Sequence, residues 1–138
     1  MKPIRITGAG LAGLSLGNAL RAADIPVRID EAGILPRHRV CGEFLCGRGA
    51  GVLRDLGLGD SLEGALFHRK VHWYAGDRRV LVARLPTPAL GLSRHCLDQR
   101  LAERFRALGG DLRLRSRLPT GSPPAPGDVR CHGRRPAC

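Results

Sequence analysis

The chain has 138 residues, 43% of them hydrophobic, which is enough for one modest domain with its own core. Its net charge of +11 comes almost entirely from scattered arginines with few aromatic residues among them, which favours a solvated basic surface over a specific nucleic-acid site. Five cysteines without a Cys-x-x-Cys pair argue against a disulfide framework, and neither the cysteines nor the histidines have the spacing of a metal site.

The first 31 residues contain the pattern of a complete βαβ unit. Residues 3–7 predict a strand, 11–23 a helix and 26–31 a second strand. A glycine-rich motif, Gly-x-Gly-x-x-Gly, joins the first strand to the helix. In this setting the motif predicts a dinucleotide phosphate site. The site would consist of Gly8, Ala9, Gly10, Leu11, Ala12 and Gly13.

Each glycine of the motif has a separate physical task. Gly8 allows a tight turn out of the strand, Gly10 lets a pyrophosphate approach the backbone, and Gly13 lets the helix pack closely on the strand. The helix that follows presents its free N–H groups and the positive end of its dipole to the phosphates.

An acidic residue, Glu31, ends the second strand about 20 residues after the glycine motif. At this place a carboxylate can accept hydrogen bonds from ribose hydroxyls, and it disfavours a 2′-phosphate. The sequence therefore predicts NAD or FAD rather than NADP in this pocket.

The rest of the chain predicts shorter elements. Residues 32–47 read as a loop rich in proline, glycine and basic residues, and 70–84 as a β-hairpin around a glycine-containing turn. The other expected elements are a short helix over 49–56, an amphipathic helix over 93–108, a half-exposed strand over 112–118 and, within a Pro/Gly-rich tail, one short strand over 129–131.

Three blocks of sequence carry a family resemblance. They are the glycine motif with Glu31, the segment 36–45 with its Cys41-Gly42-Glu43, and Gly91-Leu92-Ser93-Arg94 followed by Leu97-Asp98. Together they resemble the FAD-dependent monooxygenase and reductase superfamily of the para-hydroxybenzoate hydroxylase type. The segment 36–45 is similar to the PxxxxCGE segment of its geranylgeranyl reductase branch.

The resemblance implies an α/β fold: a Rossmann-like FAD/NAD(P)-binding βαβ unit with part of a β-rich substrate domain. Residues 1–118 would form the FAD-binding domain, within which 70–84 start a substrate-domain hairpin, and 119–138 would be a flexible tail. Family members continue into a Gly-Asp segment that binds the flavin side of the cofactor, and no Gly-Asp pair of this sequence has that context. We therefore expect the chain to correspond to the N-terminal part of such a protein.

The resemblance also implies roles for single residues. The glycine loop would cradle the FAD pyrophosphate and Glu31 would hold the adenosine ribose. Arg94 would lie near the phosphates or ribityl chain, and Arg37 with the Cys41-Gly42 turn would lie beside the flavin. Cys41 and Glu43 are the candidates for facing the substrate cavity, and no metal ligand is expected.

The expected function is FAD-dependent oxidoreduction, with reduction of an apolar double bond as in geranylgeranyl reductases. An aromatic-type monooxygenase, a catalytically inactive nucleotide-binding fragment and a basic nucleic-acid-binding module are the alternatives. The expected partners are an apolar small-molecule substrate and an NAD(P)H donor, without specific nucleic acid. Free thiols, no signal peptide and no apolar run of about 18 residues favour a cytoplasmic protein without a transmembrane segment.

Overall fold

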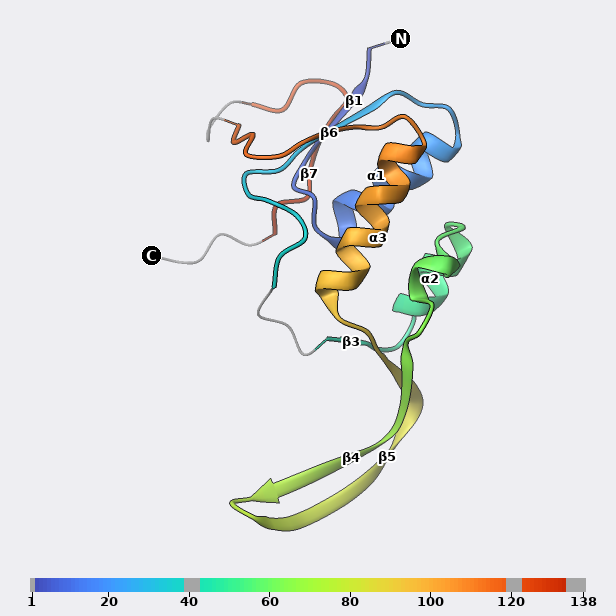
Figure 1. Ribbon diagram of the computed structural model, residues 1–138, viewed down its shortest axis with the longest axis vertical. Helices are drawn as coiled ribbons and strands as arrows, with labels where there is room; N and C mark the ends of the chain where they lie inside the picture. The colour runs from blue at the N-terminus through green and yellow to red at the C-terminus, as the bar shows by residue number, and fades with distance from the viewer. Residues whose placement is uncertain (1, 39–42, 119–122, 134–138) are drawn as a thin grey trace. The chain divides into compact units, whose positions relative to one another are not determined.

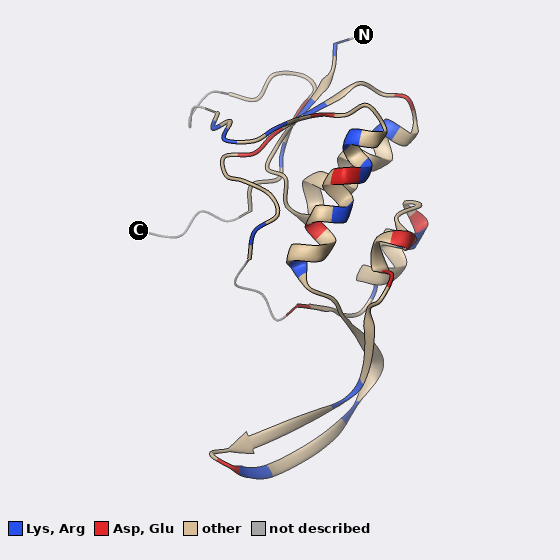
Figure 2. Ribbon diagram, viewed as in Figure 1, with Lys and Arg blue, Asp and Glu red and all other residues tan. Residues whose placement is uncertain are grey.

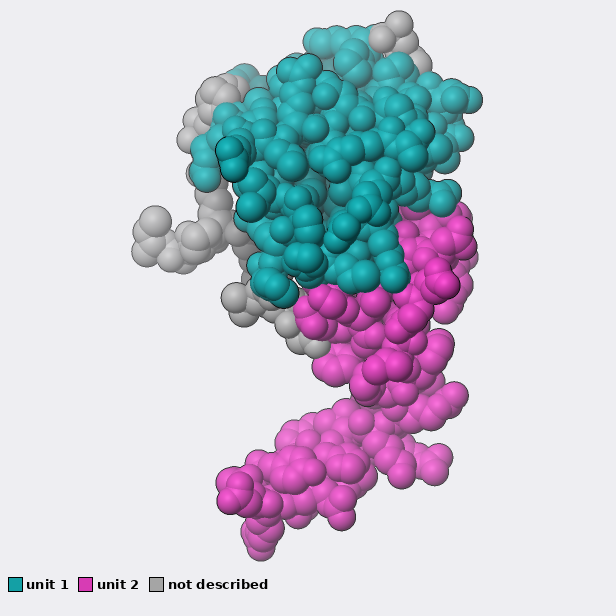
Figure 3. Space-filling view, in the orientation of Figure 1, with its two compact units in different colours: residues 1–38, 95–138 teal, residues 39–94 magenta. Residues whose placement is uncertain are grey.

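The computed structural model describes residues 2–38, 43–118 and 123–133. The chain divides into two compact units, one formed by Met1–His38 with His95–Cys138 and the other by Arg39–Arg94 (Figure 3). The first unit is thus discontinuous in sequence and extends beyond residue 118, where the sequence predicted the end of the FAD-binding domain.

A four-stranded parallel sheet forms the centre of the first unit, with the strand order β6-β2-β1-β7 (Figure 1). Its strands are β1 (Ile4–Thr7), β2 (Val27–Asp30), β6 (Asp111–Arg113) and β7 (Asp128–Arg130). Two helices, α1 (Leu11–Ala22) and α3 (Arg94–Ala107), pack on this sheet. The predicted βαβ unit and the α/β fold class are confirmed.

The core of the first unit lies between the helices and one face of the sheet. Ile6, Ile29 and Phe105 are completely buried. A Cβ atom at Gly17 would lie 2.7 Å from Ile29 Cδ1, so α1 runs directly over β2. The Asn18 side chain links the two helices, because its Nδ2 donates hydrogen bonds of 2.9 Å to the carbonyl oxygens of both Leu14 and Leu101.

The strands of this sheet alternate between apolar and charged residues. Parallel sheets usually have apolar residues on both faces, since helices cover both. Here the charged positions form ion pairs instead, one between neighbouring strands and two within a single strand. Basic residues also lie on the helices and on the hairpin (Figure 2). The pairs are Arg5–Asp128 at 2.9 Å, Arg28–Asp30 at 2.7 Å and Arg113–Asp111 at 3.0 Å.

The second unit contains a three-stranded antiparallel sheet with the order β3-β5-β4. Its strands are β3 (Phe44–Leu45), β4 (Leu66–Ala75) and β5 (Arg78–Gly91), and two short helices, α2 (Gly49–Asp55) and η1 (Gly59–Leu62), lie between β3 and β4. The predicted hairpin is confirmed and is longer than expected. Gly76 adopts φ +58° in its turn, a conformation that favours glycine.

Of two predictions near the C-terminus, one needs correction and one is confirmed. The strand expected over 112–118 is only three residues long, because Arg115 turns the chain away with φ +54°. The short strand expected over 129–131 within the Pro/Gly-rich tail is confirmed as β7, which pairs in parallel with β1, from Arg5↔Asp128 to Thr7↔Arg130. The local pattern predicted this strand but not its partner, because pairing between distant strands leaves no periodic signal in the sequence.

The Arg5–Asp128 pair joins directly opposite residues of β1 and β7, and its stability contribution depends on pH. The Arg5 hydrogen bond, with a further one from the Ala125 backbone, lowers the pKa of Asp128 from its ordinary value of 3.8. Because the folded pKa is depressed, the contribution is complete above pH 3.8 and is lost as the pH falls through the folded pKa. We expect Asp128→Asn to reduce the free energy of unfolding at pH 7 and to have little effect near pH 2, as measured by urea denaturation.

Asp111→Asn is the matched control, because it removes a carboxylate whose ion pair with Arg113 lies within one edge strand. If Asp128→Asn lowered the free energy of unfolding equally at pH 7 and near pH 2, the charge of the Asp128 carboxylate would not be the cause.

Candidate nucleotide-binding site

The turn from β1 into α1 is closely packed against the residues that follow β7. Gly8 has φ +105°, and a Cβ atom there would lie 2.8 Å from the carbonyl carbon and oxygen of Cys131. A Cβ atom at Gly13 would overlap the carbonyl oxygen of Gly8. The first and third glycines of the motif are therefore required by the fold itself, before any ligand is considered.

The middle glycine has a different environment. Gly10 is the N-cap of α1, and a Cβ atom at this position would have none of the described residues within 4 Å. The first hydrogen bond of the helix runs from the Leu14 N–H to the Gly10 carbonyl at 2.9 Å, so the N–H groups of Leu11, Ala12 and Gly13 precede it. In the part of the chain that the structure describes, no side chain caps this end, and the first turn contains no acidic residue. A helix N-terminus with this open approach suits an anion such as a diphosphate.

Glu31 lies beside the glycine loop and is only 5% exposed. Its Oε2 accepts a 2.8 Å hydrogen bond from the Ala9 N–H, and its Oε1 accepts one of 2.9 Å from the Gly33 N–H. The Arg37 guanidinium lies 3.6 Å from Oε1, and its side chain is 43% exposed. The structure thus brings the predicted acid, the glycine loop and Arg37 together in one place.

The other predicted site residues are Cys41, Gly42, Glu43 and Arg94. Cys41 and Gly42 lie outside the described residues. Glu43 has φ +57°, accepts a 3.1 Å hydrogen bond from the Ser93 hydroxyl, and its carbonyl accepts one of 3.0 Å from the Leu92 N–H. Arg94 is the first residue of α3. The catalytic and cofactor roles expected for these four residues remain predictions.

The structure adds three residues that the sequence analysis missed. Cys131 lines the glycine turn, and burial raises the pKa of its thiol, so the thiol stays protonated at neutral pH. The Ser116 hydroxyl donates a 2.7 Å hydrogen bond to Asp30. Asp30 directly precedes Glu31 in sequence, whereas Cys131 and Ser116 reach the site only through contacts between distant parts of the chain, which no local motif marks.

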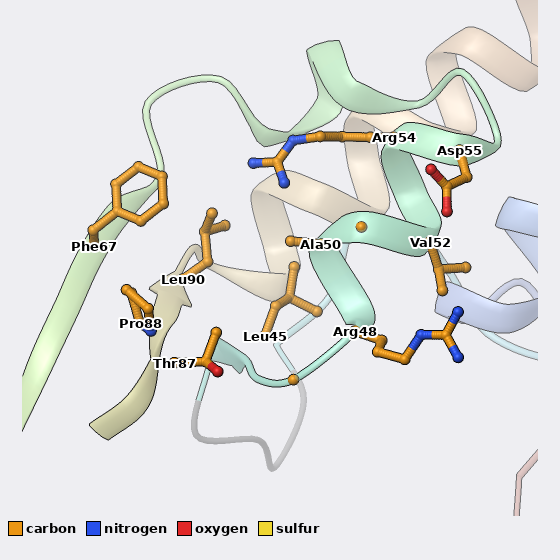
Figure 4. A pocket seen from close by; sticks show the side chains of 12 residues that line it. Leu45, Arg48, Ala50, Val52, Arg54, Asp55, Phe67, Thr87, Pro88 and Leu90 are labelled. Atoms are coloured by element: carbon orange, nitrogen blue, oxygen red, sulfur yellow. The ribbon is translucent and has the colours of Figure 1, made fainter. Parts of the chain in front are cut away.

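A separate pocket of about 350 Å³ lies within the second unit, between α2 and the strands of the antiparallel sheet (Figure 4). Leu45, Phe67 and Leu90 form its apolar side, and the Arg54 side chain extends toward them from α2. None of the predicted site residues that the structure describes lines this pocket. Among the described residues, no group of three or more His, Cys, Asp or Glu could hold a metal, and no helix could cross a membrane.

No family model matches the sequence. Solved structures do match. A tetrameric 2-methyl-3-hydroxypyridine-5-carboxylic acid oxygenase is 29% identical with a TM-score of 0.69, over 83% of this chain and 32% of that chain. The flavin-dependent monooxygenase PieE, in complex with FAD and substrate, is 22% identical with a TM-score of 0.71, over 82% and 23%. The p-nitrophenol 4-monooxygenase PnpA from Pseudomonas putida is 17% identical with a TM-score of 0.71, over 83% and 32%.

The chain has the fold of the FAD-binding unit of these flavin monooxygenases. The resemblance to the superfamily of para-hydroxybenzoate hydroxylase type is confirmed. The chain spans about a third or less of the length of the solved structures that it matches.

The different surroundings of the three glycines predict different effects of the same substitution. Gly13→Ala would force the methyl group into the Gly8 carbonyl and should lower the free energy of unfolding by about 3 kcal/mol. Gly10→Ala meets no neighbour and should cost less than about 1 kcal/mol, the scale of an N-cap change. Chemical denaturation followed by circular dichroism measures both, and equal losses would contradict this packing.

Proposed function

We propose that the chain binds FAD, with the diphosphate at the loop from Gly8 to Gly13 and the adenosine ribose at Glu31. The observation that carries the proposal is the open space at Gly10, at an uncapped helix N-terminus beside a buried carboxylate. In the first unit, the protein's own backbone fills the space that side chains at Gly8 and Gly13 would need, whereas the space at Gly10 is left for a ligand. The neighbours support FAD as that ligand, since one of them was solved with FAD bound.

Glu31 and Arg37 would act together at the ribose end of the cofactor. The Glu31 carboxylate is already oriented by two backbone N–H groups, and its remaining lone pairs can accept from ribose hydroxyls. Arg37 lies at the same carboxylate, and its half-exposed guanidinium could contact a bound anion. The sequence-based place of Arg37 beside the flavin stays a prediction.

For the whole protein, we infer FAD-dependent oxidoreduction of a small-molecule substrate. The bound flavin would supply the redox chemistry, and the protein would hold and orient it. The matching structures are an oxygenase and two monooxygenases, one of them flavin-dependent and in complex with FAD, so a monooxygenase is supported about as well as the reductase of an apolar double bond that the segment 36–45 suggests. An NAD(P)H donor and an apolar substrate belong to this proposal as well.

The test is to mix the purified chain with FAD, remove free FAD by gel filtration and record the absorbance spectrum. We expect about one flavin to co-elute with each chain. Gly10→Ala should weaken FAD binding about tenfold or more, because its methyl group occupies the approach to the helix N-terminus, while the melting temperature changes little.

Gly51→Ala is the control, since its Cβ atom would also meet nothing within 4 Å but lies on α2 in the second unit. A colourless protein that also fails to bind ADP would contradict the proposal. FAD binding without turnover of any electron donor would instead favour the inactive nucleotide-binding fragment.

A further inference from the structure

The segment that follows β6 holds the end of β2, where Glu31 lies. The Glu31 N–H donates to the Arg113 carbonyl at 2.9 Å, and the Ser116 N–H donates to the Glu31 carbonyl at 2.8 Å. The Arg115 N–H donates to the Gly33 carbonyl at 2.9 Å. Both main-chain groups of Glu31 are thus bound by a segment more than 80 residues away in sequence.

One side chain of this segment also reaches the strand. The Ser116 hydroxyl donates a 2.7 Å hydrogen bond to Asp30 Oδ1, next to Glu31. The Asp30 side chain is 0% exposed, and Arg28 binds the same oxygen at 2.7 Å. Among the described residues, Asp30 Oδ2 has no hydrogen-bond partner. The buried carboxylate therefore depends on Arg28 and Ser116, and losing either would leave it under-solvated.

We propose that Ser116 is a positioning residue for Glu31, holding β2 so that the Glu31 carboxylate meets the hydroxyls of a bound ribose. This inference rests on the proposed function of Glu31. Without the Ser116 hydroxyl, the Asp30 side chain would move toward another hydrogen-bond donor. Glu31 would move with it, because the two residues are joined by a peptide bond. The Glu31 carboxylate is held between the Ala9 and Gly33 N–H groups, so a small shift of the Glu31 backbone would change the direction in which the carboxylate oxygens point. A site held loosely binds its ligand less selectively.

Ser116→Ala isolates this role. The substitution removes the bond to Asp30 and keeps the main-chain bonds of residues 113–116. Ser15→Ala is the matched control, since the Ser15 hydroxyl is buried and has no hydrogen-bond partner among the described residues. Ser116→Thr keeps a hydroxyl and should preserve the wild-type behaviour.

The experiment compares two probes, ADP and 2′,3′-dideoxy-ADP, by isothermal titration calorimetry. The ratio of their affinities measures only the recognition of the ribose hydroxyls. We expect the wild type to prefer ADP about tenfold, the scale of a hydrogen bond to a charged group. Ser116→Ala should reduce this preference to about threefold or less, while Ser15→Ala and Ser116→Thr retain it.

The result that overturns the proposal is a loss of affinity for both nucleotides in Ser116→Ala with the preference unchanged, since that indicates only a structural role. If Ser116→Ala does not fold, Ser116→Cys, which keeps the size and weakens the donor, gives the same comparison. Glu31→Gln separates the two hypotheses. If it leaves the wild-type preference intact, or if the wild type binds neither nucleotide, the proposed function of Glu31 fails rather than the role of Ser116 alone.

Discussion

The first unit depends on one close approach, that of α1 to the end of β1. The Gly13 position lies against the Gly8 carbonyl, with no room for a side chain between them. This contact brings the N-terminus of α1 to the carboxyl end of the parallel sheet. The same turn presents the Ala9 N–H to Glu31. This backbone-to-backbone approach therefore sets the position of the helix end and supplies one of the two N–H groups that orient the acid.

The surroundings of Glu31 show how a carboxylate can be buried and still be available to a ligand. Two backbone N–H groups and a nearby guanidinium offset the loss of hydration that burial causes. These donors come from the glycine loop and from the residues just after β2, so the carboxylate is oriented before a nucleotide arrives. Preorganisation of this kind reduces the conformational cost of binding.

The parts of the fold that follow from the sequence are those with a strong local pattern. The Gly-x-Gly-x-x-Gly motif between apolar runs identified the βαβ unit, and the β-rich stretch around Gly76 identified the hairpin. Strand β7 was expected over 129–131, but its place beside β1 was not, because its three residues carry no signal of a partner strand. It is stable as a strand because it pairs with β1 and because Arg5 lies opposite Asp128, and local sequence contains neither fact.

The candidate site divides in the same way. The sequence predicted four of its residues, because they form a motif with a fixed spacing that is typical of dinucleotide sites: Gly8, Gly10, Gly13 and Glu31. Ser116 was not predicted, because its partner Asp30 is 86 residues away. The roles of the glycines were also only partly foreseen: the structure shows that two serve packing and that Gly10 alone leaves open space.

The hairpin of the second unit has a practical consequence for any spectroscopic study of the chain. Trp73 is the only tryptophan and lies on β4, with about half of its surface exposed (49%). Intrinsic tryptophan emission therefore reports on the hairpin and not on the unit that carries the glycine loop. Far-ultraviolet circular dichroism reports on both. Melting curves from the two signals would coincide only if both units unfold in one cooperative transition, so their comparison measures the thermodynamic coupling of the units directly.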